Sequence, residues 1–168
     1  NLAIDDVYAR GIHLASQGKL VRDIEPYNYP EKAKNTVIMK RNLGAADFDI
    51  TAPSGANSVR VRVIGVVENQ APTKALEAEL PILDGLVGMD ADNDVCQIAL
   101  VERHHATGNI TNAFVSGFRY KLPCAMASTV AHDSHHMIVV GTNKADMAQA
   151  ANRLREIGGG VVLISQGK

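Results

Sequence analysis

The C-terminal part of the chain carries an amphipathic helix pattern between two short apolar runs. Residues 137–141 and residues 161–164 are apolar and partly β-branched, and each run predicts a buried strand. Between them, Asn143 is a good helix N-cap, Asp146 stands where the acid of a capping box belongs, and the glycines at 158–160 stop the helix. The apolar positions that fall on one face of this helix are Met147, Ala150, Ala151, Leu154 and Ile157. A strand, a helix and a strand in this order predict a βαβ unit with a right-handed crossover, so at least part of the sheet is parallel.

Three earlier segments also predict strands. Residues 59–64 alternate apolar and basic side chains, as a strand with one buried face does, and residues 95–101 form a further apolar run. Residues 73–80 fit a helix or a strand by periodicity, and the turn signals close on both sides favour the strand. The prediction is an α+β fold, with a mixed β-sheet and packed helices, including the C-terminal βαβ unit. The chain is not a TIM barrel, because that fold needs about 200 residues or more.

The first third of the chain has a weaker pattern. Residues 6–21 predict a small hairpin. Residues 26–58 are rich in proline and turn residues and predict an irregular connector, with a candidate short strand at 36–39. These patterns divide the chain into a segment 1–25, the connector, and a main domain 59–168.

A run of five polar residues, 132–136, separates two apolar runs that both predict buried strands. It reads His-Asp-Ser-His-His. A buried polar atom without a partner costs roughly 1–3 kcal/mol, so such a run at the junction of two core strands points to function more than to stability. Histidine exchanges a proton near neutral pH and aspartate can fix its tautomer. The candidate catalytic residues are therefore His132, Asp133, Ser134 and His135.

The same segment has two other interpretations. As a plain polar loop, its Asp133 and Ser134 would form an Asx-type turn. As a metal site, it would supply three imidazoles from His132, His135 and His136, but no matching carboxylate or cysteine pair accompanies them. All three interpretations stay open from the residues alone.

A second histidine pair, His104-His105, follows the predicted strand at 95–101. Such a pair at a strand end is more often a surface feature than a site. Glu102 and Arg103 beside it can form a plain surface ion pair of little energetic value. The polar residues that follow keep this pair as a secondary site candidate.

The composition narrows the classes of function. Seventeen basic and eighteen acidic residues give a net charge of −1, and there is no Trp and 4% aromatic residues, which argues against a nucleic-acid partner. No apolar run reaches the ~18–20 residues that span a bilayer, and no signal peptide is visible, so we expect no membrane partner. Cys96 and Cys124 are isolated, which fits a reducing cytoplasm. The chain begins with Asn, which leaves open that it is a piece of a longer protein.

The residues at 131–142, together with the pattern that runs from Asp146-Met147-Ala148 to the glycines at 158–160, resemble a known family. They are similar to the C-terminal domain of bacterial adenine deaminase, which belongs to the amidohydrolase superfamily. The resemblance covers residues 59–168, including Leu100 to Arg103 and Gly117-Phe118, and is loose over 1–22. His136 departs from the pattern, because the family usually carries Asn at that position.

The resemblance implies a fold and an activity. The segment 1–25 would be the tail of the superfamily's small β-sandwich, and residues 59–168 the C-terminal domain, truncated at its end. The parent enzyme would convert adenine and water into hypoxanthine and ammonia, as in purine salvage, on a barrel that carries iron or manganese. The barrel's His-x-His motif is absent from these 168 residues. The chain would therefore pack on a barrel domain of the same polypeptide, hold no metal itself, and be inactive alone.

The resemblance also implies site roles and partners. The His132–His135 loop would face the active site and position adenine, shuttle a proton, or exclude water as a lid. Glu102 and Gly117 become secondary candidates for substrate binding. The expected partners are adenine and the missing barrel in the cytoplasm, and a homo-oligomer is left open. The alternative is a stand-alone small-molecule or metal-binding module without catalysis, and a barrel-length sequence with His-x-His upstream of Asn1 would decide against it.

Overall fold

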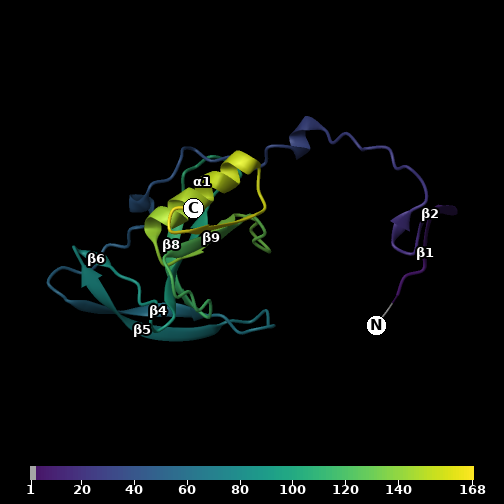
Figure 1. Ribbon diagram of the computed structural model, residues 1–168. Coiled ribbons are helices and arrows are strands. Elements are labelled where there is room, and N and C mark those ends of the chain that lie inside the picture. The colour runs from purple at the N-terminus through teal and green to yellow at the C-terminus, as the bar shows by residue number, and fades with distance from the viewer. Residues whose placement is uncertain (1–2) are drawn as a thin grey trace. The chain divides into compact units, whose positions relative to one another are not determined.

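The computed structural model describes residues 3–168 and divides into two units, one ending at Ala33 and one running from Lys34 to Lys168 (Figure 1). The N-terminal unit is a three-stranded antiparallel sheet followed by a short 3-10 helix, η1. Its elements are β1 (Asp6–Ala9), β2 (Ile12–Ser16), β3 (Lys19–Leu20) and η1 (Glu31–Ala33). The two-residue turns Arg10-Gly11 and Gln17-Gly18 have positive φ at all four residues, as type I′ hairpin turns require.

The turn predicted at 16–19 is confirmed as the connection of β2 to β3. The segment 6–14, expected to be one extended strand, is instead broken by the turn at Arg10-Gly11 into β1 and β2. The assignment of the segment 1–25 to a small β-sandwich stays a prediction, and its first two residues lie outside the described residues. The predicted limits of the connector 26–58 and of the domain 59–168 also stay predictions.

The second unit is built on one mixed sheet of eight strands, in the order β11-β9-β10-β7-β8-β4-β5-β6. All neighbouring strands are antiparallel except β4 and β8, which are parallel. The α+β prediction is confirmed, and the described sheet does not close into a barrel. The strands are β4 (Ser58–Gly65), β5 (Lys74–Leu83), β6 (Leu86–Val87), β7 (Val95–Val101), β8 (Ile110–Ser116), β9 (Cys124–Ser128), β10 (Met137–Gly141) and β11 (Val161–Ser165).

The C-terminal strand–helix–strand unit has one more strand inside it than the sequence pattern shows. Both β10 and β11 pair antiparallel with β9, so they run parallel to each other with β9 between them. The helix α1 (Lys144–Ile157) joins them and packs on all three strands (Figure 1). The predicted parallel orientation is confirmed, but the two strands are not hydrogen-bonded neighbours.

The ends of α1 follow the sequence signals, with one correction. Asn143 Oδ1 accepts a hydrogen bond from Asp146 N at 3.0 Å, and Gly158 ends the helix in the left-handed conformation with φ 81°. The capping-box role of Asp146 was wrong. Its Oδ1 instead accepts from Gly167 N at 3.0 Å, because the chain after β11 returns to the helix start.

The buried face of α1 is close to the prediction. Met147, Ala150, Ala151 and Leu154 are fully buried and form the main core with strands β7, β9, β10 and β11. Ile157 was expected on this face but is 47% exposed, because it is the last helical residue, where Gly158 turns the chain away. The core on this side of the sheet therefore ends at Leu154.

The segment between Lys34 and β4 is irregular but well anchored. The candidate strand at 36–39 does not form: Ile38 N donates to Arg103 O, and the buried Arg103 side chain binds Thr36 O at 2.9 Å. The segment contains one short 3-10 helix, η2 (Ala45–Phe48). Its apolar side chains that enter the main core are Val37, Met39, Leu43 and Phe48. This segment forms, with α1, the layer that covers one face of the sheet.

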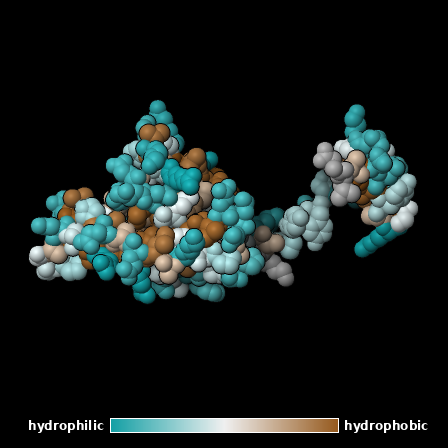
Figure 2. Space-filling view, turned by 90° about the horizontal axis from the view of Figure 1, so that it is seen from below, coloured by the Kyte–Doolittle hydropathy of each residue, from teal (hydrophilic) through white to brown (hydrophobic). Residues whose placement is uncertain are grey.

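The other face of the sheet has no helix on it among the described residues. In β11, Val161 and Leu163 are 61% and 64% exposed, while Ile164 is buried toward the helix side. Apolar side chains also gather between polar ones on the face of the second unit that Figure 2 shows. None of the helices in residues 3–168 is long and apolar enough to cross a membrane.

Candidate functional site

The polar segment forms the connection between β9 and β10. Ala131 and Met137 at its ends are buried, whereas residues 132–135 are exposed. The side chains of His132 and Asp133 are 95% and 93% exposed, and His132 Nδ1 lies 3.2 Å from Asp133 Oδ1. The imidazole and the carboxylate thus face solvent, where a ligand can reach them.

The backbone of this loop is tightly folded. His135 N donates to Ala131 O at 2.7 Å, and Ser134 N donates to His132 O at 3.2 Å. Asp133 and His135 adopt positive φ of 74° and 51°, conformations that cost free energy for residues other than glycine. The Ser134 hydroxyl accepts a hydrogen bond from His136 N, which agrees with the interpretation as a plain polar loop. The Asp133 carboxylate, which that interpretation places in an Asx-type turn, contacts His132.

The register of β10 on β7 brings a second histidine segment to this loop. Met137 pairs with Val101, so the residues that follow β7 lie beside those that precede β10. His104 Nε2 is 3.2 Å from Ser134 O, and the rings of His104 and His136 have centroids 5.0 Å apart. All the histidines of the chain except His13 therefore lie in these two adjoining segments.

Glu102 shapes the second segment. Its carboxylate accepts hydrogen bonds from the backbone N–H groups of His105 and Thr107 at 2.7 and 2.9 Å, from His104 N, and from the Thr107 hydroxyl. Burial alone would raise the pKa of Glu102, but the hydrogen bonds from Thr107, His105 and His104 outweigh it and lower the pKa to about 2. The carboxylate is ionised at neutral pH, and its bonds fix the turn that carries His104.

We expect Glu102→Gln to destabilise the protein at pH 7, since an amide cannot accept these bonds as a carboxylate does. A carboxyl group with a lowered pKa stabilises the fold above its ordinary value of 4.5, and this stabilisation is lost as the pH falls through about 2. Urea unfolding of wild type and variant should therefore give different midpoints at pH 7 that converge at about pH 2. Glu68→Gln, at an exposed position, is the control. Equal midpoints at pH 7 would contradict this role for Glu102.

Gly117 lies at the other end of the β7–β8 hairpin. Val101 pairs with Ile110 at the histidine end, whereas Val95 pairs with Ser116 next to Gly117. Six residues of extended strand separate the two ends, which is about 20 Å. Gly117 N donates to Asp94 Oδ2, and a Cβ at position 117 would lie 2.9 Å from the Val66 Cβ. The structure thus gathers Glu102 and residues 132–135 at one end of the sheet and leaves Gly117 at the other.

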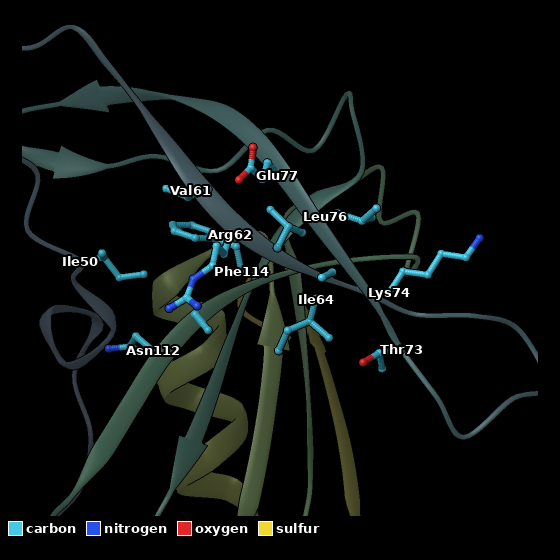
Figure 3. A pocket seen from close by; sticks show the side chains of 13 residues that line it. Ile50, Val61, Arg62, Ile64, Thr73, Lys74, Leu76, Glu77, Asn112 and Phe114 are labelled. Atoms are coloured by element: carbon cyan, nitrogen blue, oxygen red, sulfur yellow. The ribbon is translucent and has the colours of Figure 1, made fainter.

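An open cleft is lined by residues of β4, β5 and β8 (Figure 3). Strands β4 and β8 pair only from Val63 to Gly65 on β4, so their remaining edges diverge. The space is about 900 Å³ and is lined by Ile50, Val61, Phe114, Leu76 and the polar Arg62 and Asn112, among others. None of the candidate site residues lines it. Across residues 3–168, no group of three or more His, Cys, Asp or Glu side chains is arranged to hold a metal ion.

The sequence profile of the adenine deaminase C-terminal domain family matches residues 70–168, more than half of the chain. The chain belongs to this family. The resemblance drawn from residues 131–142 and the glycines at 158–160 is therefore confirmed.

Similar curated proteins carry the same name. The chain is 70% identical over 167 residues to "Adenine deaminase" of Mesorhizobium japonicum, covering 99% of the chain and 28% of that protein. It is 66% identical to "Adenine deaminase 3" of Rhizobium meliloti, with the same coverage, and 60% identical to "Adenine deaminase" of Ruegeria pomeroyi, covering 100% and 28%. The chain thus spans about 28% of the length of these relatives.

That His104 and His136 contact each other beside the loop was not predicted from the sequence. The sequence signal was present, as a histidine pair at a strand end and a third histidine in the loop. Their contact depends on the pairing of β7 with β10, which joins segments about thirty residues apart. Sequence spacing alone could not bring them together.

Proposed function

We propose that this chain is the C-terminal domain of an adenine deaminase, a hydrolase that converts adenine and water into hypoxanthine and ammonia. Two findings support this proposal: the match to the family, and the fact that the chain spans only about 28% of the length of relatives named adenine deaminase. The chain would pack on a barrel domain formed by the rest of the longer polypeptide. The proposed location is the cytoplasm, whose reducing environment fits the two buried free cysteines, Cys96 and Cys124. The proposed process is purine salvage.

The loop at residues 132–135 is the part of this chain that we propose meets the substrate. In the reaction, water oxygen forms a bond to C6 of the purine and the exocyclic C–N bond breaks. One proton of the water ends on N1 of the ring and the other on the leaving nitrogen, which departs as ammonia. An imidazole can donate that proton or hydrogen-bond a ring nitrogen of adenine. The observation that carries this role is the exposure of His132 and Asp133 on a folded loop whose two ends are buried.

The resemblance also implies a divalent metal, iron or manganese, in the parent enzyme. The described residues do not fit such a site: His132 and Asp133 are the two members of an exposed pair, and both oxygens of Glu102 already accept hydrogen bonds from backbone N–H groups and from the Thr107 hydroxyl. We therefore assign the metal to the part of the longer protein that this chain does not span. The proposed role of this chain is to position the substrate or to move a proton.

A chimaera tests this proposal. It consists of the Mesorhizobium japonicum relative with its matching 28% replaced by this chain, which is 70% identical to it. We expect the chimaera to release ammonia from adenine, and this chain alone to release none with iron or manganese supplied. Turnover by the chain alone at the rate of the chimaera would overturn the domain proposal. A folded, metal-loaded chimaera without turnover would do the same.

A further inference from the structure

We propose that His104 is a positioning residue that holds the loop at residues 132–135 in its folded conformation. Among the described residues, the one hydrogen bond that reaches residues 132–135 from outside the segment 131–136 comes from His104 Nε2, which donates to Ser134 O at 3.2 Å. The loop's other hydrogen bonds are its own, between His135 N and Ala131 O, Ser134 N and His132 O, and His136 N and Ser134 Oγ. Two of its residues have positive φ, a sparsely populated conformation, and an external hydrogen bond favours one conformation of the loop.

Hydrogen bonds of the backbone and of the neighbouring residues hold His104 in place. Its backbone N–H binds the Glu102 carboxylate, as does the N–H of His105. The preceding residue, Arg103, is buried and binds Thr36 O in the segment that packs beside β7. The backbone that carries the His104 side chain is therefore held by the Glu102 carboxylate and, through Arg103, by the segment that packs beside β7. A fixed imidazole that reaches across to a strained loop is suited to set the position of that loop.

The ring of His104 makes a second contact, with the ring of His136 at the other end of the loop. The centroids are 5.0 Å apart and the planes are tilted by 41°. His136 is half-buried and leads directly into the buried start of β10 at Met137. His104 thus touches both the middle of the loop, at Ser134 O, and its anchored end. Its neighbour His105 has its ring 6.3 Å from that of His104 and has no side-chain hydrogen bond to the loop.

The contact does not depend on which side chains the loop carries, because Ser134 accepts through its backbone carbonyl. The catalytic consequence rests on the proposed function: if His132 and His135 act on adenine, their placement depends on His104. A displacement of about 1 Å in a catalytic group can lower a rate by about 100-fold. The structural consequence, an ordered loop, is independent of what the loop binds.

Amide hydrogen exchange tests the structural half in this chain. We expect His104→Ala to increase exchange at His135 N by about threefold to tenfold, the effect of losing one net hydrogen bond. His104→Gln should restore protection, because its amide nitrogen can stand where Nε2 does and can donate to Ser134 O. His105→Ala is the matched control and should change nothing. Unchanged exchange in His104→Ala, or no rescue by Gln, would overturn the proposal.

Steady-state kinetics of the same variants in the chimaera test the catalytic half. We expect kcat for adenine to fall by about tenfold to 100-fold in His104→Ala, with Tm within about 2 °C, and to recover in His104→Gln. If exchange rises but kcat stays, while His135→Asn still lowers kcat, His104 does not position the catalytic residue. If neither His104 nor His135 variants alter kcat, the proposed role of the loop fails instead, and the exchange result still stands on its own.

Discussion

Replacing Leu154 with Ala should lower the free energy of unfolding of this protein by about 2–5 kcal/mol. Leu154 is fully buried on the face of α1 that packs on the sheet, within the cluster that also contains Met147 and Val139. Truncation to Ala removes apolar contacts and leaves a cavity, and the surrounding structure relaxes only in part. For a chain of this length, the loss corresponds to a fall in Tm of roughly 5–15 °C, measured by thermal or urea unfolding.

Ile157→Ala is the matched control on the same helix. Ile157 is 47% exposed, so its truncation should cost less than about 1 kcal/mol. If both variants lost the same stability, the packing of α1 on β9, β10 and β11 would be wrong. A small effect of Leu154→Ala alone would also contradict the fully buried position of this side chain.

The helix illustrates what the sequence does predict. Its limits, 144 and 157, follow from local signals: the Asn143 side chain binds the N–H of Asp146, and Gly158 adopts a left-handed conformation that other residues avoid. These signals act within one helical turn. The apolar spacing also located the buried face, up to Leu154. Asp146 shows the limit of such local signals. Its carboxylate accepts a hydrogen bond from the N–H of Gly167, which follows β11 in the chain, and does not complete the capping box.

The order of the strands could not be predicted in the same way. Apolar runs located β7, β10 and β11, but nothing in their composition places β9 between β10 and β11. The parallel pairing of β4 with β8 joins segments about fifty residues apart and covers only three residues of each strand. Such pairings are decided by the packing of the whole sheet, and local patterns carry little information about them.

The candidate site could also be predicted only in part. The polar run at 132–135 could be recognised because it interrupts two apolar runs, and the structure places it on the surface with its ends buried. The contact of His104 with this loop could not be recognised from the sequence, because it follows from the register of β7 on β10. The resemblance also proposed Gly117, which lies at the opposite end of the β7–β8 hairpin.

Replacing His132 or His135 with Asn in the chimaera should affect activity far more than stability. If one imidazole transfers a proton to the leaving ammonia, its loss should lower kcat by about 10²–10⁴-fold. If it only orients the purine, KM should rise with kcat nearly unchanged. Both side chains are exposed, so neither substitution removes a core contact. Measuring kcat and KM for each variant separately assigns the two roles, and the Tm of each reports on folding.

The proposed role of the loop is tested most directly by kcat and KM for adenine of the chimaera that carries both His132→Asn and His135→Asn, measured beside the unsubstituted chimaera. We expect a loss of about 100-fold or more in kcat, or a matching rise in KM, with Tm changed by less than about 2 °C. Unchanged kcat and KM in the double variant would rule this role out, since the loop would then join β9 to β10 without taking part in the reaction.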